Sequence, residues 1–278
     1  MSLNRFVRKI FPSISRLTYN PAFKIFVNFF DRFDSIFHYD KLFFPDNHLR
    51  IRIGVGNNFF GNKFHYYTDS FYFWMFSILQ GYVNLKSDIL DIGVGVGRSA
   101  HLLRDFNFCQ SSFNGSYTGI DIDEEMIAWC RENFDKERFT FLHSSNSSKS
   151  YNQDGTEEPY RISQPDSSKD FIFSRSLYTH LLEAEAQNYL NESYRLLRNG
   201  GHAMHSVFCL DFLPPTYGKR HTFSFSLGNA SVESLAQPEA AVAYTKDFLF
   251  EMAKKAGFKD PVIKHSEGHL QPFLILKK

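Results

Sequence analysis

The chain of 278 residues lacks the features that mark several classes of protein. Its three cysteines, Cys109, Cys130 and Cys209, form no Cys-x-x-Cys or Cys/His cluster, which argues against a disulfide framework or a zinc site. The formal net charge is only +1, whereas a dedicated nucleic-acid-binding protein normally has a strong basic excess. No apolar run approaches the roughly 18 residues of a membrane-spanning helix. We therefore expect a cytoplasmic protein whose cysteines are small buried hydrophobes.

The first thirty residues differ from the rest of the chain in charge. They contain no Asp or Glu, and their basic residues alternate with apolar and aromatic ones. Because Arg8 and Lys9 interrupt the apolar stretch, a secretory signal is disfavoured. Three interpretations stay open: an amphipathic helix that packs on the domain or frays, a peripheral contact with an anionic membrane, and an organellar transit peptide. We expect residues 1–60 to form an N-terminal extension that is helical, basic and aromatic, and residues 61–278 to form one domain.

What the sequence does contain is an alternation of strand and helix patterns. After a helix expected at 68–83, apolar runs typical of strands alternate with segments of helical apolar spacing. This alternation predicts an α/β fold, a Rossmann-like doubly wound sheet. The last two strands are joined by only a few residues, so we expect a mostly parallel sheet with an antiparallel C-terminal strand. Strands are expected at 88–93, 116–122, 138–143, 169–176, 202–208, 261–267 and 272–278, and helices at 97–106, 123–134, 183–197 and 245–258. The helix at 183–197 is expected to end at Asn199-Gly200-Gly201, which has the composition of a C-terminal stop.

A glycine-rich turn follows the first strand. In "LDIGVGVGR" (90–98), Gly93, Gly95 and Gly97 stand at every second position. Glycines at this place let the backbone approach a ligand and present N–H groups at the start of the next helix. The dinucleotide fingerprint G-x-G-x-x-G would need a third glycine where the chain has Arg98. A nicotinamide-dependent oxidoreductase is therefore disfavoured.

The same stretch closely resembles the first motif of class I S-adenosylmethionine-dependent methyltransferases. "GIDIDEEMIAWC" (119–130) resembles the second motif of that family, and "DFIFSRSLYTHLL" (170–182) and "RLLRNGGHAMHSVF" (195–208) resemble its fourth- and fifth-strand regions. The likeness covers about residues 60–278. Two weaker matches, 48–56 and 238–258, resemble flanking segments of bacterial enzymes that methylate small molecules or glycans.

The resemblance implies a role for each residue of a cofactor site. Asp91 would face the cationic methionine end of S-adenosylmethionine, and Asp121 would accept hydrogen bonds from the ribose hydroxyls. Ser145 and Asn146 stand where the family often has an acid that contacts adenine. The full set expected to bind the cofactor is Asp91, Gly93, Gly95, Gly97, Asp121, Ile122, Ser145, Asn146 and Ser174. For Asp123, Glu124 and Glu125 we favour helix capping instead.

The residues after the fourth strand are expected to meet the methyl acceptor. A hydroxyl acceptor needs a base, and His180 is the candidate because histidine titrates near neutral pH. His205, within the fifth strand, is expected to be a core residue. The histidines show no spacing such as His-Glu-x-x-His, so we predict no metal.

We therefore expect an enzyme that methylates a small molecule or glycan, at a hydroxyl. Methyltransferases that act on nucleic-acid amino groups typically carry Asn/Asp-Pro-Pro-aromatic after the fourth strand, and this chain has Ser-Arg-Ser-Leu-Tyr (174–178) instead. The alternative is a cofactor-binding protein of this fold without transfer activity, with a regulatory or scaffold role. Residues 208–229 are either a lid over the acceptor or a flap over the sheet edge.

Overall fold

The computed structural model describes residues 17–37, 45–53, 63–108, 110–144, 160–213, 221–265 and 270–278. The chain divides into two compact units, which separate between Tyr72 and Phe73 within helix α5 (Lys63–Leu79). The boundary expected after residue 60 lies outside the described residues and stays a prediction.

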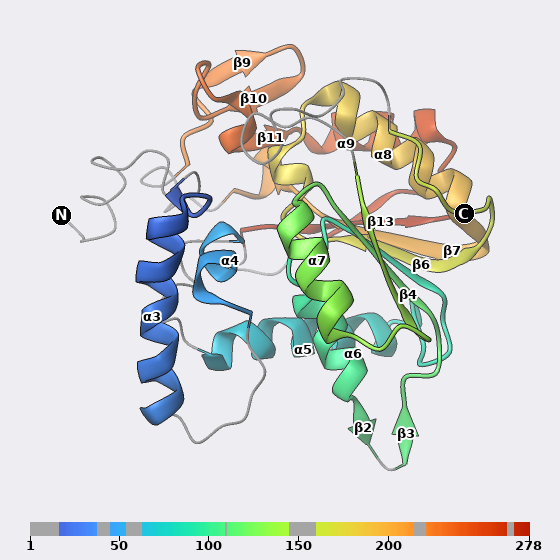
Figure 1. The fold of residues 1–278 in the computed structure, drawn as a ribbon. Coiled ribbons are helices and arrows are strands. Elements are labelled where there is room, and N and C mark those ends of the chain that lie inside the picture. Colours follow the sequence, from blue (N-terminus) through green and yellow to red (C-terminus); the bar gives the residue numbers. More distant parts are fainter. Residues whose placement is uncertain are drawn as a thin grey trace. The chain divides into compact units, whose positions relative to one another are not determined.

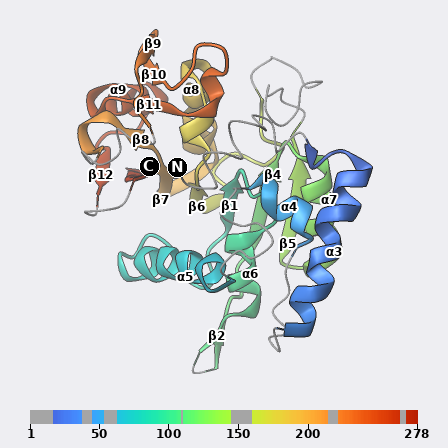
Figure 2. The same cartoon turned by 90° about the vertical axis from the view of Figure 1, so that its left-hand side faces the viewer.

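The first unit contains helices α3 (Pro21–Phe37) and α4 (Asn47–Arg52), which lie side by side (Figure 2). Two buried arginines of α4 join it to α3 and to the turn that precedes α3. Arg52 donates from Nε to Thr18 Oγ1 over 2.9 Å, and Arg50 forms an ion pair of 2.7 Å with Asp31 on α3. The N-terminal extension is thus helical over residues 21–37, as expected, whereas residues 1–16 lie outside the described part.

The second unit is built on a seven-stranded sheet in the order β12-β13-β7-β6-β1-β4-β5. The strands from β5 to β7 are parallel, β13 is antiparallel to β7, and β12 is antiparallel to β13. This confirms the predicted fold class. The strands are β1 (Ile89–Ile92), β4 (Tyr117–Asp121), β5 (Phe139–His143), β6 (Lys169–Ser174), β7 (Leu197–Ser206), β12 (Val262–Lys264) and β13 (Phe273–Lys277).

Helices cover both faces of this sheet (Figure 1). The end of α5, with α6 (Arg98–Asp105) and α7 (Glu124–Asn133), packs on one face, and α8 (Glu183–Leu196) and α9 (Lys246–Ala256) pack on the other. Alternate residues of β1 supply both cores: Ile89 lies in the first core, and Leu90 and Ile92 lie in the second. Asp123 caps α7 by accepting the N–H groups of Glu125 and Met126, as its sequence position predicted.

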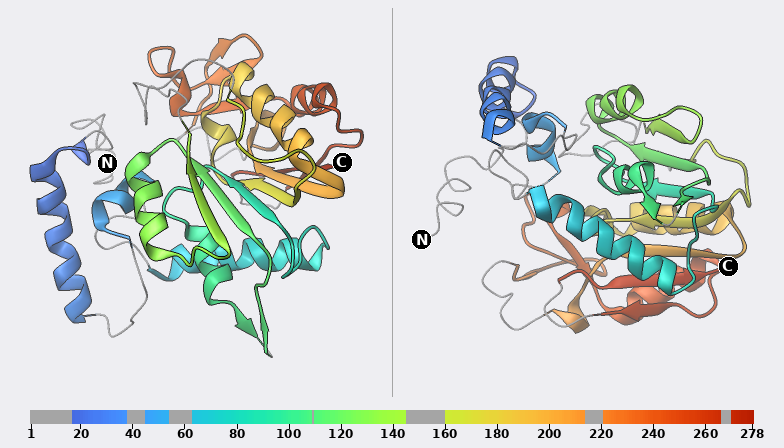
Figure 3. Two further views of the ribbon diagram at one scale, coloured as in Figure 1. Left: turned by 45° about the vertical axis from the view of Figure 1, so that its right-hand side comes forward. Right: turned by 90° about the horizontal axis from the view of Figure 1, so that it is seen from below.

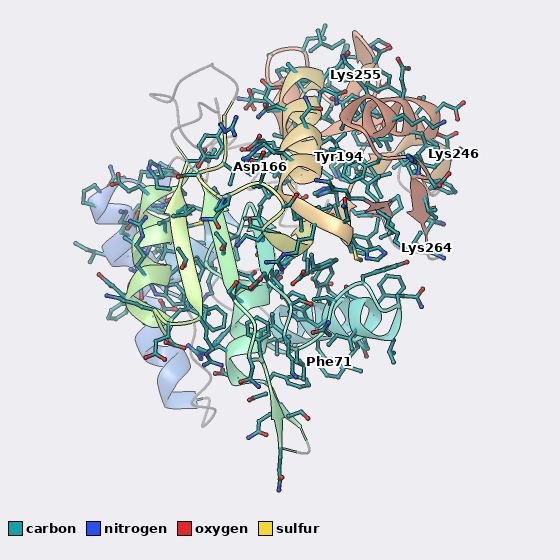
Figure 4. The ribbon with its side chains drawn as sticks, turned by 90° about the vertical axis from the view of Figure 1, so that its right-hand side faces the viewer. Phe71, Asp166, Tyr194, Lys246, Lys255 and Lys264 are labelled. Carbon is teal, nitrogen blue, oxygen red and sulfur yellow. The ribbon has the colours of Figure 1, made fainter. Side chains whose placement is uncertain are left out.

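Two helices differ from prediction. Helix α5 spans 63–79 rather than 68–83, and α8 ends at Leu196 instead of running to the Asn199-Gly200-Gly201 turn. Those glycines belong to β7, where Gly200 N–H donates to the Lys278 carbonyl over 2.7 Å. Lys278 also donates from Nζ to the carbonyl of Tyr194, a residue of α8 labelled in Figure 4, over 2.7 Å. The two glycines thus pair with Lys278 and do not cap the end of α8.

A second sheet was not predicted. It has the order β8-β11-β10-β9 and consists of β8 (Phe208–Cys209), β9 (Phe225–Leu227), β10 (Ala230–Val232) and β11 (Val242–Tyr244). It occupies part of the segment that we expected to be a lid or a flap, of which residues 214–220 lie outside the described part. A short hairpin of β2 (Asn107–Phe108) and β3 (Ser111–Ser112) was also missed, and it follows the end of α6 (Figure 3).

Among the described helices, none combines the length and the apolar character needed to cross a membrane.

Candidate functional site

The loop between β1 and α6 has a backbone that only glycine adopts readily. Gly93, Gly95 and Gly97 have φ angles of +82°, +54° and +70°. A Cβ at Gly97 would also lie 2.8 Å from the ring of Phe134. The loop therefore brings its backbone close to the end of α7. Because glycine has no side chain, these three positions place no side chain over the N–H groups at the start of α6.

The carboxylate of Asp121 meets this loop at the end of β4. Its Oδ2 accepts the N–H of Gly95 over 2.7 Å, and its Oδ1 accepts the N–H of Asp123 over 3.0 Å. Burial raises the pKa of Asp121 to about 6, although these backbone hydrogen bonds oppose the rise. The structure thus brings together the acid at the end of the second parallel strand and the glycines after the first.

Asp91, two residues before Gly93, is buried on the face of the sheet that α5 and α6 cover. Its side chain is 3% exposed, and its Oδ2 accepts a hydrogen bond of 2.5 Å from the hydroxyl of Tyr117 on β4. Burial raises the pKa of Asp91 to about 7, against the lowering effect of Tyr117 and of the nearby Arg175. A buried carboxyl group that ionises near neutral pH suits a cationic ligand.

The segment after β6 lies against the glycine loop. A Cβ at Gly93 would be 3.5 Å from Leu177, so this residue and the loop are neighbours. Ser176 has a φ of +59°, which is unusual outside glycine. Its N–H donates to Ser206 Oγ over 2.6 Å and its Oγ donates to Gln271 Oε1 over 2.9 Å, which holds this conformation in place. Such local strain is typical of functional segments.

His180 ends the 3₁₀ helix η2 (Tyr178–His180), one turn beyond Leu177. Its Nδ1 lies 2.8 Å from the carbonyl oxygen of Glu239, in the 3₁₀ helix η5 (Pro238–Ala240). A carbonyl only accepts, so Nδ1 carries the proton and the lone pair of the neutral ring is on Nε2. Burial lowers the pKa of His180 despite the hydrogen bond to Glu239, which favours this neutral form at pH 7.

Ser174, at the end of β6, is directed into the protein. It is fully buried, and its Oγ lies 2.9 Å from Nδ1 of His205 on β7. His205 is also fully buried, as expected for a core residue, and burial lowers its pKa to about 3. A contact of Ser174 with a ligand would therefore use its backbone rather than its hydroxyl.

The residues expected to contact adenine are only partly in view. Ser145 and Asn146 lie outside the described residues, and Ile122 is half-buried beside Asp121. Ser144, which sequence reasoning missed, is buried and donates its N–H to the Asp121 carbonyl over 2.8 Å. Its side chain hydrogen-bonds the hydroxyls of Tyr160 and Tyr189. No motif marks these two tyrosines, because the fold brings them to Ser144 from distant segments.

Comparison with known proteins agrees with this geometry. Residues 90–205 match the family described as "Methyltransferase domain", a range that contains the glycine loop, Asp121 and the segment after β6.

Solved structures share the fold. A presumed O-methyltransferase of Nostoc punctiforme aligns with 16% identity and a TM-score of 0.53 over 76% of this chain and 56% of its own, slightly more than half its length. A Bordetella parapertussis protein, described as an exported protein candidate, aligns with 15% identity and a TM-score of 0.51 over 76% of this chain and 67% of its own. An S-adenosylmethionine-dependent methyltransferase of Methanosarcina mazei has 22% identity over 72% of this chain and 96% of its own, with a TM-score of 0.48.

Residues 90–205 therefore match a methyltransferase domain, and the protein is a methyltransferase.

Proposed function

We propose that the protein transfers a methyl group from S-adenosylmethionine to a hydroxyl of a small molecule or glycan. The observation that carries the proposal is the hydrogen bond between Gly95 N–H and Asp121 Oδ2, which joins the glycine loop to the acid at the end of β4. The residues present fit the cofactor. The loop has the left-handed backbone of glycine at Gly93, Gly95 and Gly97, and the buried Asp91 and the half-buried Asp121 lie beside it.

Each part of the site has a distinct role in this proposal. Asp91 attracts the cationic end of the cofactor, Gly93, Gly95 and Gly97 let the backbone approach it, and Asp121 accepts the ribose hydroxyls. We assign contact with the adenine to Ile122, Ser145 and Asn146, with Ser144 as an additional residue, and a backbone contact to Ser174. S-adenosylmethionine, when bound, supplies an electrophilic methyl group on a sulfonium.

His180 is the proposed base. Since its Nδ1 donates to the Glu239 carbonyl, Nε2 is the atom that takes the proton of the acceptor hydroxyl. The lowered pKa keeps the ring neutral and able to accept that proton at pH 7. The segment 174–180 also positions the acceptor beside the glycine loop, and positioning accounts for much of the catalysis in such a displacement.

We further propose a cytoplasmic location, no nucleic-acid partner and no metal. Cys130 and Cys209 are both free and buried, in keeping with a reducing compartment. Contact with a membrane surface through residues 1–30 remains part of the proposal because that segment is basic and aromatic.

Turnover with a panel of sugars and phenols tests the proposal, with formation of S-adenosylhomocysteine as the readout. His180→Gln is expected to lower kcat by about 10²- to 10⁴-fold, because the proton loses its acceptor. Binding of S-adenosylmethionine should stay within about twofold, since a tenfold change would correspond to 1.4 kcal/mol of lost contact. His202→Gln is the matched control: His202 is half-buried on β7, pairs with Lys277 and is remote from the glycine loop.

If the protein binds S-adenosylmethionine but methylates no member of the panel, the alternative is favoured, a cofactor-binding protein with a regulatory or scaffold role. If His180→Gln keeps full turnover, another group is the base.

A further inference from the structure

Two neighbouring parallel strands place a hydroxyl and a carboxylate in contact beneath the glycine loop. Asp91 on β1 is in register with Gly119 on β4, so Tyr117, two residues earlier, lies on the same face of the sheet. The Tyr117 hydroxyl donates to Asp91 Oδ2 over 2.5 Å. Tyr117 is fully buried, so water does not compete for this bond.

Within the described part of the chain, Tyr117 is the one side chain that hydrogen-bonds Asp91. The pKa of Tyr117 is raised well above its usual value, by burial first and by Asp91, so the phenol keeps its proton and acts as the donor. A donor at this distance from a carboxylate favours the ionised form and holds the carboxylate in one orientation.

Charged groups on several elements act on Asp91. Arg175, after β6, and Arg98, at the start of α6, favour the ionised carboxylate, whereas burial and Asp121 oppose it. The thiol of Cys130 on α7 is protonated, because burial and the two carboxylates raise its pKa well above the usual value. Burial outweighs the lowering influences and leaves the pKa of Asp91 at about 7, so neutral pH lies within its titration range. The hydrogen bond from Tyr117 is the largest of the influences that favour the charged form.

We propose that Tyr117 is a positioning residue of the cofactor site, whose hydroxyl holds Asp91 as an oriented anion for the cationic end of S-adenosylmethionine and thereby links cofactor affinity to pH. This inference rests on the proposed cofactor site. It assigns a role to a residue that lies outside every motif, at the start of a strand, 26 positions from its partner.

Tyr117→Phe tests the inference, with calorimetric Kd values measured from about pH 6 to about pH 9 on either side of the Asp91 pKa. In the wild-type protein, affinity for S-adenosylmethionine should rise with pH through about 7, as Asp91 ionises. Without the hydroxyl, ionisation of Asp91 needs a higher pH, so the affinity should fall about tenfold at pH 7 and approach the wild-type value at about pH 9. S-adenosylhomocysteine lacks the sulfonium charge, so its loss should be smaller.

Two variants serve as controls. Tyr244→Phe removes another buried hydroxyl bond, of 3.0 Å to the Leu181 carbonyl, and should leave the pH dependence unchanged. In Asp91→Asn, the affinity for S-adenosylmethionine should lose the part of its pH dependence that Tyr117→Phe shifts. The part due to Asp121 should remain. Wild-type protein should also release protons on binding at pH 6.5, seen in two buffers of different ionisation enthalpy, which tests the linkage even if Tyr117→Phe does not fold.

An unchanged Kd in Tyr117→Phe, or a loss of equal size at every pH, would overturn the inference, since the second result indicates a merely structural role. Absence of proton release by the wild-type protein would also overturn it. If the wild-type protein binds neither ligand at any pH, the proposed function fails together with the inference. Binding that is insensitive to Tyr117 leaves the proposed function standing.

Discussion

Gly97 shows how narrowly a single residue of the loop is constrained. Its φ is +70°, and a Cβ there would lie 2.8 Å from the ring of Phe134. Gly81 is a matched case, because its φ is +72° but nothing lies within 4 Å of its Cβ position. Substitutions at the two positions therefore separate the cost of backbone strain from the cost of steric overlap.

We predict that Gly97→Ala lowers the free energy of unfolding by about 2–4 kcal/mol, the sum of strain and overpacking. Gly81→Ala should cost only about 1 kcal/mol, the strain alone. Urea unfolding of both variants measures the difference. Equal losses would show that Phe134 moves aside without cost and that packing does not require glycine at this position.

The roles of residues within a motif were predictable from the sequence. Roles that depend on contacts between distant segments were not. Asp91, Asp121 and the three glycines follow from a short local pattern. The partner of Asp91 does not, because Tyr117 reaches it only through the register of β1 against β4. The position of Ser174 at the end of its strand was predictable from the sequence, but the direction of its side chain toward His205 was not.

At the scale of elements, a cluster of ion pairs joins β1, β6 and β7 at the edge of the sheet opposite the site. Arg198, on β7, donates to Asp170 on β6 over 2.6 Å and to Asp88, just before β1, over 2.7 Å. Burial raises the pKa of Asp88, but hydrogen bonds from Ser116 and Arg198 outweigh it and hold that pKa below its usual value. This ion-pair cluster ties three strands together while leaving their carboxyl ends to the site.

We predict that Arg198→Gln lowers the free energy of unfolding by about 1 kcal/mol or less at pH 7, because the ion pairs are partly exposed. A lowered pKa means that the contribution of Asp88 is present above its unfolded pKa and is lost as pH falls through the folded one. The difference from wild type should therefore shrink in acid. Affinity for S-adenosylmethionine should not change.

Denaturant unfolding at several pH values measures this effect, with Arg161→Gln as the control. Arg161 is 74% exposed and lies 3.6 Å from Asp166, so its loss should have no effect. A fall in cofactor affinity in Arg198→Gln would show instead that the two edges of the sheet are coupled.

The elements that sequence predicted are those with long apolar patterns. The central parallel strands β1, β4 and β6 are buried on both faces, so they read as short apolar runs, and the helices carry clear apolar stripes. The second sheet escaped prediction because its strands have two or three residues and all three residues of β9 are exposed. A strand that is so short and so exposed shows no alternation of apolar and polar residues in the sequence.

For the whole molecule, the strand order explains why distant motifs form one site. The central strand β1 has β4 on one side and β6 on the other, all parallel, so their carboxyl ends meet at one edge. Asp91, Asp121 and the segment that leads to His180 are thereby neighbours although they span ninety residues of sequence. Ligands of open α/β sheets bind at such an edge. We propose that this edge binds S-adenosylmethionine through Asp121 and the glycine loop.

The most direct test is calorimetric binding of S-adenosylmethionine and S-adenosylhomocysteine to wild-type protein, Asp121→Ala and Asp135→Ala. Asp135 also accepts a backbone N–H, from Glu137 over 2.9 Å, but it lies after α7, and its carboxylate bonds Glu137 and Arg138 rather than the loop. We predict binding of both ligands, weakened more than about tenfold, or 1.4 kcal/mol, by Asp121→Ala and unchanged by Asp135→Ala. Folded wild-type protein that binds neither ligand, or Asp121→Ala that binds both like wild type, would contradict the claim.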